Sequence, residues 1–350
     1  MRIQLISKKY LPAAGGSERS IHALLLHAIA RGHEVEAVVC ADPKYRGVAA
    51  MGSVALRLAA TENEIANAIS RFAPEVVFTQ IDWSETAVEC ARQAHIPVVY
   101  FSRVGDANSG ADLLVFNSHS IRDLWVRERP ELEYRSLVLY PTILADDLGP
   151  AQPAGAAILC INPVRAKGGH LILEIAHRLP EMRFLAVRGW CDPSADGVDF
   201  SRTPNVKLVP PRGGIKHFCA ESFLLLVPSV WNEPFGRVVV EAMSFGLPVL
   251  AYRRGGIPEA MGGAGVLLPE EADATTWVEA IQKLTNSPEA YAAQRDLALR
   301  RAARYPAECD PGRFFDRLSA LLDAYSGPLP LIGAPGRRVN SEWFSNLEDR

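Results

Sequence analysis

Two glutamates around the predicted start of a helix are the residues of this 350-residue chain best suited to bind and position a substrate. A buried strand ends at Ser229, a loop carries Glu233, a helix is predicted to begin near Gly236, and Glu241 follows within it. Glycine at that point lets a phosphate reach the first backbone N–H groups of the helix, which have no partners inside the helix. Carboxylates beside such an anion site can hold hydroxyl groups. The pattern therefore indicates a ligand that carries both phosphate and hydroxyl groups.

Each glutamate also has a simpler explanation. Glu241 lies four residues after Arg237, so the two side chains share a helix face and can form an ordinary surface ion pair. Glu233 can act as an acidic cap of the helix, and Trp231 beside it can line a sugar pocket or simply pack. Either explanation suffices for one glutamate, but the two together in one loop–helix segment favour a ligand site.

Two cations, Arg165 and Lys167, stand between a predicted strand over 157–161 and a helix that opens at Gly168-Gly169. In open α/β sheets, ligands bind at the carboxyl ends of the strands. Fixed cations and a helix dipole stabilise a pyrophosphate leaving group, whose negative charge grows as its bond breaks. The alternative is a solvated surface loop, which is less favoured because Lys167 lies in the turn itself.

Gly15 and Gly16 separate the first predicted strand, 3–7, from a helix, and they give the backbone room to approach an anion. Taken alone, this pair is more simply an ordinary strand–helix turn. The Gly-x-Gly-x-x-Gly fingerprint is missing, so nothing specifies NAD.

Short apolar runs separated by helical patterns predict parallel βαβ units and an α/β fold. The predicted strands are 3–7, 34–40, 75–80, 97–102, 113–118, 136–140, 157–161, 183–189, 206–211, 223–229, 248–252 and 265–269. A Pro-, Gly- and Ala-rich linker is predicted over 146–156, and both halves begin with a strand, a Gly-Gly loop and an amphipathic helix.

Residues 273–326 are predicted to be helical, with breaks at 286–288 and at Pro306. We therefore expect two nucleotide-binding folds facing each other, formed by residues 1–150 and 151–309. The last residues, 327–350, are expected to form a tail that drapes over another surface or is disordered.

The segment from Glu233 through Glu241 resembles the E-x7-E motif of the GT-B glycosyltransferases, in particular the large retaining family 4. The likeness covers most of the chain. Its other matching segments are Gly15-Gly16, Phe116-Asn117-Ser118, Lys167-Gly168, Val227-Pro228-Ser229 and Gly255-Gly256-Ile257-Pro258-Glu259. The resemblance implies two Rossmann-like doubly wound domains around a central cleft, with a C-terminal helix at residues 310–326 crossing back onto the N-terminal domain.

The resemblance also implies transfer of a sugar, with retention at the anomeric carbon, from a nucleoside-diphosphate sugar to a hydroxyl of a saccharide or small-molecule acceptor. Glu233 would hold hydroxyls of the donor sugar, Glu241 the ribose, and Lys167 the diphosphate. The amides implied to contact the diphosphate and sugar are those of Phe235, Gly236, Arg237 and Val238, with Gly15 and Gly16 closing from the N-terminal domain. The nucleotide is expected to be UDP or GDP. No cofactor is expected, and no metal site is predicted because no Asp-x-Asp stands at a strand end.

The chain departs from the family pattern at two places. The family has Gly-Arg five or six residues before the lysine, where this chain has Ile161-Asn162, and Arg165 is the nearest candidate to replace that guanidinium. Many members carry a histidine where Ser102-Arg103 stands here. We therefore take Arg103, and His119 at a predicted helix start, as acceptor-side candidates. The alternatives are a nucleotide-sugar epimerase on the same scaffold and an inactive nucleotide-sugar-binding subunit, which the missing arginine would favour.

The composition of the chain argues against a nucleic-acid-binding protein and against a membrane-spanning one. There are 37 Lys and Arg residues against 40 Asp and Glu, a formal net charge of −3, so the chain lacks the basic field of a nucleic-acid binder. No apolar stretch approaches the length of about 18 residues that a membrane-spanning helix needs, and the first residues lack a signal-peptide core. Six dispersed cysteines without Cys-x-x-Cys are typical of free thiols. These features predict a cytoplasmic protein without a transmembrane segment, and they leave the oligomeric state open.

Overall fold

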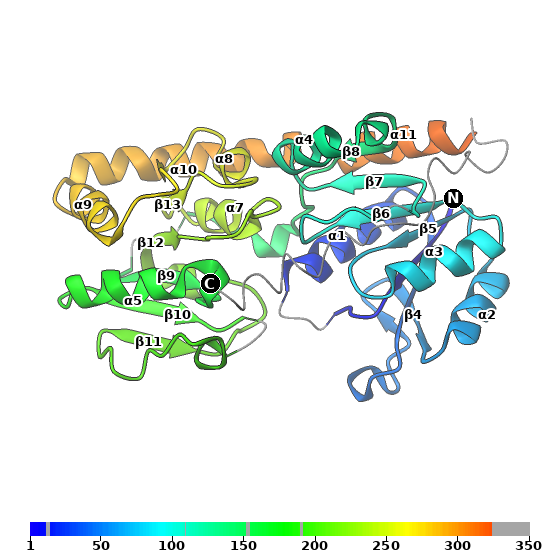
Figure 1. Cartoon of the computed structure of the whole chain (residues 1–350), viewed down its shortest axis with the longest axis horizontal. Helices are drawn as coiled ribbons and strands as arrows, with labels where there is room; N and C mark the ends of the chain where they lie inside the picture. The colour runs from blue at the N-terminus through cyan, green and yellow to red at the C-terminus, as the bar shows by residue number, and fades with distance from the viewer. Residues whose placement is uncertain (12–14, 109, 152–154, 190–191, 324–350) are drawn as a thin grey trace. The chain divides into compact units, whose positions relative to one another are not determined.

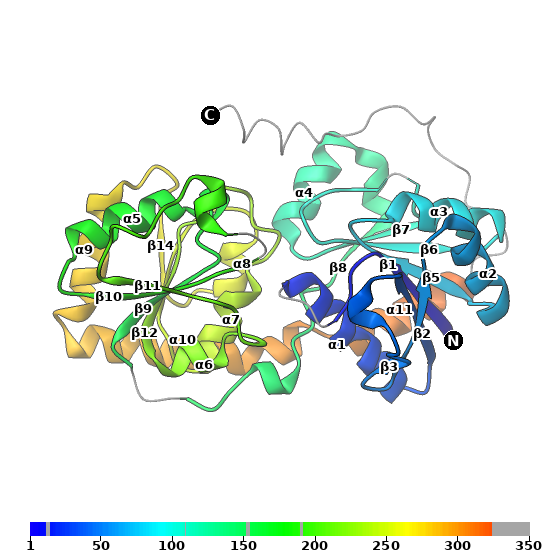
Figure 2. The same cartoon turned by 90° about the horizontal axis from the view of Figure 1, so that it is seen from below.

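A computed structural model describes residues 1–350 except 12–14, 109, 152–154, 190–191 and 324–350. The chain forms two compact units, one comprising 1–11, 17–142 and the chain from 310 onward, the other comprising 12–16 and 143–309 (Figures 1 and 2). The boundary thus follows residue 142, whereas the sequence placed it at 150. The expected tail, 327–350, lies outside the described residues.

The first unit is built on an eight-stranded sheet of order β3-β4-β2-β1-β5-β6-β7-β8, which is parallel except between β3 and β4. The strands are β1 (Arg2–Ser7), β2 (Glu34–Cys40), β3 (Ala50–Met51), β4 (Val54–Ala59), β5 (Val76–Thr79), β6 (Val98–Ser102), β7 (Leu113–Phe116) and β8 (Ser136–Val138). The central strands are apolar on both faces because helices cover both faces.

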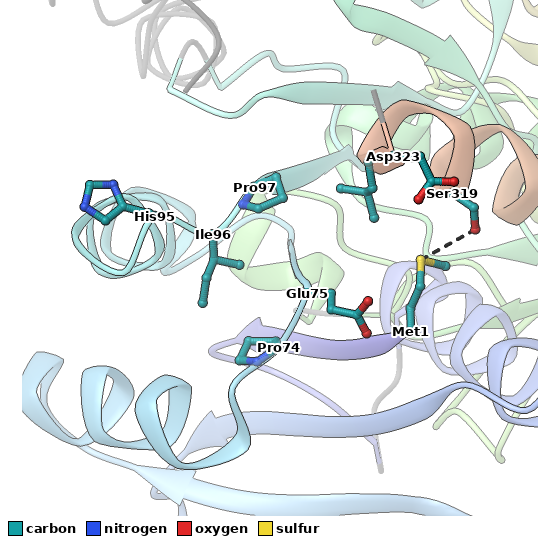
Figure 3. Close-up of a pocket in the computed structure, with 9 residues that line it drawn as sticks. Met1, Pro74, Glu75, His95, Ile96, Pro97, Ser319 and Asp323 are labelled. Carbon is teal, nitrogen blue, oxygen red and sulfur yellow. Dashed lines mark hydrogen bonds between the residues drawn. The ribbon is translucent and has the colours of Figure 1, made fainter. Parts of the chain in front are cut away.

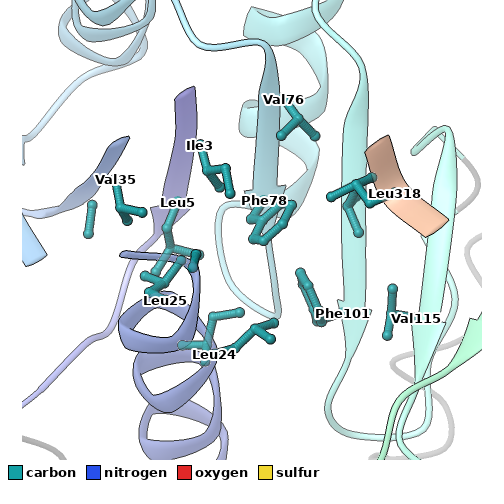
Figure 4. Close-up of a cluster of buried hydrophobic side chains, with 14 of the residues drawn as sticks. Ile3, Leu5, Leu24, Leu25, Val35, Val76, Phe78, Phe101, Val115 and Leu318 are labelled. Atoms are coloured by element: carbon teal, nitrogen blue, oxygen red, sulfur yellow. The ribbon is translucent and has the colours of Figure 1, made fainter. Parts of the chain in front are cut away.

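Helices formed by the described residues cover both faces of this sheet. They are α1 (Gly16–Ala30) and α11 (Pro311–Asp323) on one face, and α2 (Glu62–Phe72), α3 (Ser84–Gln93) and α4 (His119–Glu128) on the other. Figure 4 shows the core beneath α1 and α11, where Phe78 and Phe101 lie edge to face with ring centroids 5.1 Å apart. Leu24 of α1 and Leu318 of α11 belong to the same cluster, so the end of the described chain completes the core of the first unit.

The second unit has a six-stranded parallel sheet of order β11-β10-β9-β12-β13-β14. Its strands are β9 (Ala157–Ile161), β10 (Arg183–Val187), β11 (Val206–Val209), β12 (Ser222–Val227), β13 (Val249–Tyr252) and β14 (Val266–Leu268). Helices α5 (Gly169–Arg178) and α9 (Ala274–Thr285) cover one face around the buried Trp277. On the other face lie α6 (Lys216–Ala220) and α7 (Arg237–Ser244), with α8 (Ile257–Met261) and α10 (Pro288–Glu308) packed against α7.

Two sequence expectations about the elements are wrong. The hairpin of β3 and β4 was not predicted, because β4 is a half-exposed strand near the sheet edge whose apolar run is interrupted by Arg57. The break expected at Pro306 is absent, since α10 runs on to Glu308. Tertiary contacts hold the helix through the proline: Tyr305 is buried against Phe235, and Arg301 donates from Nε to the carbonyl of Ala260.

Two histidines that face Phe315 of α11 have unfavourable surroundings for a charge: His27 of α1, and His33 in the turn after that helix. The rings of His27 and His33 lie 6.1 and 5.4 Å from that of Phe315. Neither Nε2 atom has a hydrogen-bond partner among the described residues. Burial, and then the positive charges of Arg31 near His27 and of the chain's amino group near His33, lower the pKa of both imidazoles; Asp310 and Glu75 act in the opposite direction.

Because the folded pKa values lie below the unfolded value of about 6.5, protonation favours the unfolded chain. The free energy of unfolding should therefore be highest above pH 7.5 and should fall as the pH drops through 6.5 toward 5. Urea unfolding of the wild type and of a His27→Leu/His33→Leu variant measures this contribution, which the variant should lose. The exposed His95→Leu serves as the control. A pH dependence equally steep in the double variant would contradict this account.

Candidate functional site

The strand order of the second unit reverses between β9 and β12, so the loops that follow these strands meet at one edge of the sheet. This is the place where open α/β sheets bind ligands. The loops are in contact, since the N–H of Val230 donates to the carbonyl of Ala166 over 3.0 Å. Gly168 has a φ of +76°, and a Cβ there would stand 2.1 Å from the carbonyl oxygen of Pro228. Only glycine lets the two loops approach this closely.

Lys167 and Glu233, predicted on separate loops, form an ion pair between Nζ and Oε1. The side chains are 15% and 9% exposed. Ser229 donates from Oγ to the same carboxylate oxygen over 2.6 Å, and Nζ of Lys167 lies 4.4 Å from the ring centre of Trp231. The structure thus brings together Lys167, Glu233 and Trp231, and adds Ser229.

Burial is the largest influence on both charges of this pair. It lowers the pKa of Lys167, against the opposing pull of Glu233. Burial also acts to raise the pKa of Glu233, but the charge and hydrogen bond of Lys167, followed by the hydrogen bonds of Ser229 and Trp231, act in the opposite direction and that pKa is lowered. Glu233 is accordingly held as a carboxylate.

The main chain of Glu233 is fixed from a third loop, which follows β13. The N–H of Gly256 donates to the carbonyl of Glu233 over 2.7 Å. Gly255 has a φ of +54°, and a Cβ on it would lie 2.4 Å from the same oxygen. Of the Gly255-Gly256 pair noted in the sequence, Gly255 is therefore required by its close approach to Glu233.

Helix α7 begins at Arg237, with Gly236 as its N-cap at a φ of +93°. A Cβ on Gly236 would stand 2.4 Å from Cδ1 of Ile257, so the helix start is set tightly against α8. The side chain of Phe235 is buried, while Val238 is half-buried. The first turn of α7 thus presents the predicted amides of residues 235–238 at a helix N-terminus, where a negative charge is stabilised.

Arg237 and Glu241 form the ion pair that their spacing allows, through Nε and Oε1. The pair is not on the surface, as the side chains are 8% and 7% exposed. Nη2 of Arg237 also pairs with Asp147, which is 7% exposed. Burial acts to lower the pKa of Arg237, but the charges of Glu241 and Asp147 outweigh it and that pKa is raised.

Sequence reasoning missed Asp147, which it placed in the predicted linker 146–156. This part of the prediction is wrong, because Asp147 is a buried partner of α7. Its signal in the sequence is weak: two adjacent acids in a segment rich in proline and glycine carry no periodicity that indicates which one is buried.

Asn162 was noted only as a departure from the family pattern, and its structure is unusual. It has a φ of +53°, is buried, and neither atom of its side-chain amide has a hydrogen-bond partner among the described residues. It lies five residues before Lys167, where the family has arginine. Arg165, the expected replacement, is exposed; its N–H donates to the carboxylate of Asp196, and its guanidinium lies beside Gly197.

In the first unit, Arg103 joins the carboxyl ends of three adjacent strands. Its Nε donates to Oε1 of Gln80 over 3.0 Å, and its Nη1 donates to Oδ1 of Asn117 over 2.9 Å. These residues follow β5, β6 and β7. His119 is the first residue of α4, is exposed, and lies edge-on to the ring of Tyr140.

The other predicted residues of the first loop are Gly15 and Gly16, of which Gly16 begins α1. The loop residues 12–14 lie outside the described residues. The roles predicted for Gly15, Gly16, Arg103 and His119 stay predictions.

A cavity of about 360 Å³ lies at the amino ends of β5 and β6, away from all of these residues (Figure 3). It is lined by Met1, Pro74, Glu75, His95, Ile96, Pro97, Ser319, Leu322 and Asp323. Ser319 donates from Oγ to the sulfur of Met1 over 3.7 Å. This edge of the sheet is opposite to the ligand-binding edge, so we do not assign the site there.

Residues 204–301 match the family model described as glycosyl transferases group 1, a segment that contains both glutamates and the whole of α7. Over this segment the chain is similar to the glycosyl transferases group 1 family. Similar curated proteins include a D-inositol 3-phosphate glycosyltransferase of Corynebacterium urealyticum, 32% identical over 162 residues, and one of Corynebacterium jeikeium, 39% identical over 83 residues. The matches cover 40% and 23% of this chain, and only 37% and 20% of those relatives' lengths.

Solved structures match over nearly the whole chain. Anabaena Alr3699/HepE in complex with UDP and glucose gives a TM-score of 0.75 at 16% identity, covering 93% of this chain and 100% of that one. Sucrose-phosphate synthase of Thermosynechococcus elongatus gives 0.77 at 17% identity, covering 92% and 99%. The fold of this chain is therefore GT-B, as the sequence predicted. None of the helices in the described ranges combines the length and apolar character needed to cross a bilayer.

The Lys167–Glu233 pair should show in the stability of the unliganded protein. Lys167→Met leaves the carboxylate buried without its cation and should lower the free energy of unfolding by about 3 kcal/mol. Lys167→Met/Glu233→Gln should recover part of this loss, because no unpaired charge is left. Urea unfolding at pH 7.5 measures both variants.

The control is the exposed pair Arg178–Glu174, whose side chains are 45% and 54% exposed. Arg178→Met should cost no more than about 1 kcal/mol. If Lys167→Met proves no more costly than this control, the ion pair is not held in a low-dielectric environment.

Proposed function

We propose that this protein is a retaining glycosyltransferase that moves a sugar from a nucleoside-diphosphate sugar to an acceptor hydroxyl without a metal ion. The observation that carries the proposal is the Lys167–Glu233 pair, which lies where the strand order reverses and on the loop that leads into α7. The family match and the relatives named as glycosyltransferases support it. The UDP bound to a protein of the same fold supports a nucleotide donor.

In this proposal, the diphosphate binds at the amides of residues 235–238 and competes with Glu233 for Lys167. A diphosphate carries more negative charge than one carboxylate, so it draws the ammonium group toward itself. The released oxygen of Glu233 then accepts hydrogen bonds from donor-sugar hydroxyls, while Ser229 keeps the carboxylate in place. Glu241 holds the ribose. The ion pair of the unliganded protein thus keeps both groups charged and close to their working positions.

The reaction needs no covalent intermediate on the protein. The bond from the anomeric carbon to the diphosphate oxygen breaks, the bond to the acceptor oxygen forms on the same face, and the acceptor's proton passes to the departing diphosphate. The protein contributes positioning of the two substrates and stabilisation of the growing negative charge by Lys167 and the start of α7. We propose Arg103 and His119 for the acceptor side, with a saccharide or small molecule as acceptor.

A thermal-shift panel of UDP, GDP, ADP and dTDP, followed by sugar derivatives of the tightest binder, tests donor recognition. A nucleotide at about 100 times its Kd should stabilise the protein by about 2.7 kcal/mol. Glu233→Ala and Lys167→Ala should each lower transfer at least about 100-fold, because each removes a charge from the proposed transition-state contacts. Lys283→Ala, an exposed lysine of α9, is the matched control.

Near wild-type transfer in both variants would refute the roles of Glu233 and Lys167. Incubation of the donor without an acceptor separates the classes of enzyme. Transfer predicts slow hydrolysis or no change, whereas an epimerised nucleotide sugar would identify an isomerase. Tight donor binding without turnover on any acceptor would identify a binding subunit.

A further inference from the structure

Residues 147–149, here called the docking segment, are bound to both ends of α7. At the start of the helix, the carboxylate of Asp147 pairs with Nη2 of Arg237. At its end, the N–H of Gly149 donates to Oγ of Ser244 over 3.2 Å. A Cβ on Gly149 would stand 2.0 Å from the ring of Phe245, so the segment lies directly on the helix terminus.

The two residues that the docking segment contacts, Arg237 and Ser244, each also donate a hydrogen bond to Glu241. Arg237 donates from Nε to the side-chain oxygen Oε1 of Glu241, and Ser244 donates from Oγ to the main-chain carbonyl of Glu241 over 2.7 Å. Asp147 therefore acts on the glutamate's carboxylate through one residue, and Gly149 acts on its backbone through another. The side chains of Asp147, Arg237 and Glu241 are at most 8% exposed, so solvent screens these interactions little.

The guanidinium group of Arg237 is planar and rigid, so its partners fix its orientation together. These partners are Glu241 on Nε, Asp147 on Nη2 and, over 3.4 Å, the carbonyl of Gly16 on Nη1. With Asp147 on Nη2, the Nε–H is directed at Glu241. Replacing Asp147 by a neutral residue removes a charge-assisted bond and allows the guanidinium to rotate toward whatever acceptors remain. The carboxylate of Glu241 would then lose its fixed direction.

We propose that Asp147 is a positioning residue that orients Glu241 for recognition of the donor's ribose without touching the ligand. The proposal rests on the proposed function, because it takes Glu241 as the ribose contact. It separates two parts of donor binding. The diphosphate meets Lys167 and the start of α7, and only the ribose depends on the docking segment.

The test compares two ligands that differ in the presence of the nucleoside, which includes the pentose that Glu241 is proposed to hold. Asp147→Asn should weaken the tightest-binding nucleoside diphosphate of the four-member panel about tenfold, a size typical of coupling within one hydrogen-bonded network. Its affinity for inorganic pyrophosphate should stay within twofold of the wild type. Isothermal titration calorimetry gives both affinities, and circular dichroism shows that the variant is folded at the working temperature.

The matched control is Asp146→Asn, which removes the same charge from the exposed neighbouring residue and should leave both affinities unchanged. Ser244→Ala cuts the second link and should again weaken only the nucleotide. In the Glu241→Ala background, adding Asp147→Asn should have no further effect on nucleotide binding, since the group it positions is gone.

Unchanged nucleotide affinity in Asp147→Asn overturns the positioning role while the proposed function stands. Equal losses for nucleotide and pyrophosphate also overturn it, because they show a general disturbance of α7. Wild-type protein that binds none of the four nucleotides overturns the proposed function and this assignment with it.

Discussion

The ion pair between Lys167 and Glu233 depends on two opposite charges being held together with little access to water. Each charge is costly to bury by itself, and each is tolerated because the other is near. The pair also requires contact between the loops after β9 and β12. Residue 168 must therefore be glycine, because its backbone is left-handed and the carbonyl of Pro228 lies against it. The loop after β13 adds a third constraint by holding the main chain of Glu233. The loops after β9, β12 and β13 thus all hold the residues of one salt bridge in place.

The helix that follows shows a second use of buried charge. Arg237 lies between two carboxylates, one from its own helix and one from residues 147–149. An excess of one negative charge among these three groups is acceptable because the guanidinium has enough donors to serve both acids. The residues predicted to bind the donor are therefore parts of two electrostatic clusters that meet on one loop–helix segment.

Much of this architecture was predictable. Parallel strands covered on both faces are continuously apolar, so β1, β5 and β12 are evident from the sequence alone, as is the start of α7 after Gly236. The half-exposed strand β4 was missed because Arg57 interrupts its apolar pattern. The helix break predicted at Pro306 was wrong because tertiary contacts of Tyr305 and Arg301 outweigh the tendency of proline to end a helix. For the site, spacing suggested the Arg237–Glu241 pair. Neither the burial of this pair nor the ion pair of Asp147 with Arg237 could be predicted, because both depend on contacts between segments 90 residues apart.

Asn162 carries an energetic consequence for whatever binds beside it. A buried amide that makes no hydrogen bond costs about 1–3 kcal/mol relative to one that is satisfied. Asn162 places this cost in the turn that leads from β9 to Lys167. A ligand that supplies a hydrogen-bond donor and an acceptor to this amide would remove that cost. Part of its binding free energy would then come from satisfying Asn162.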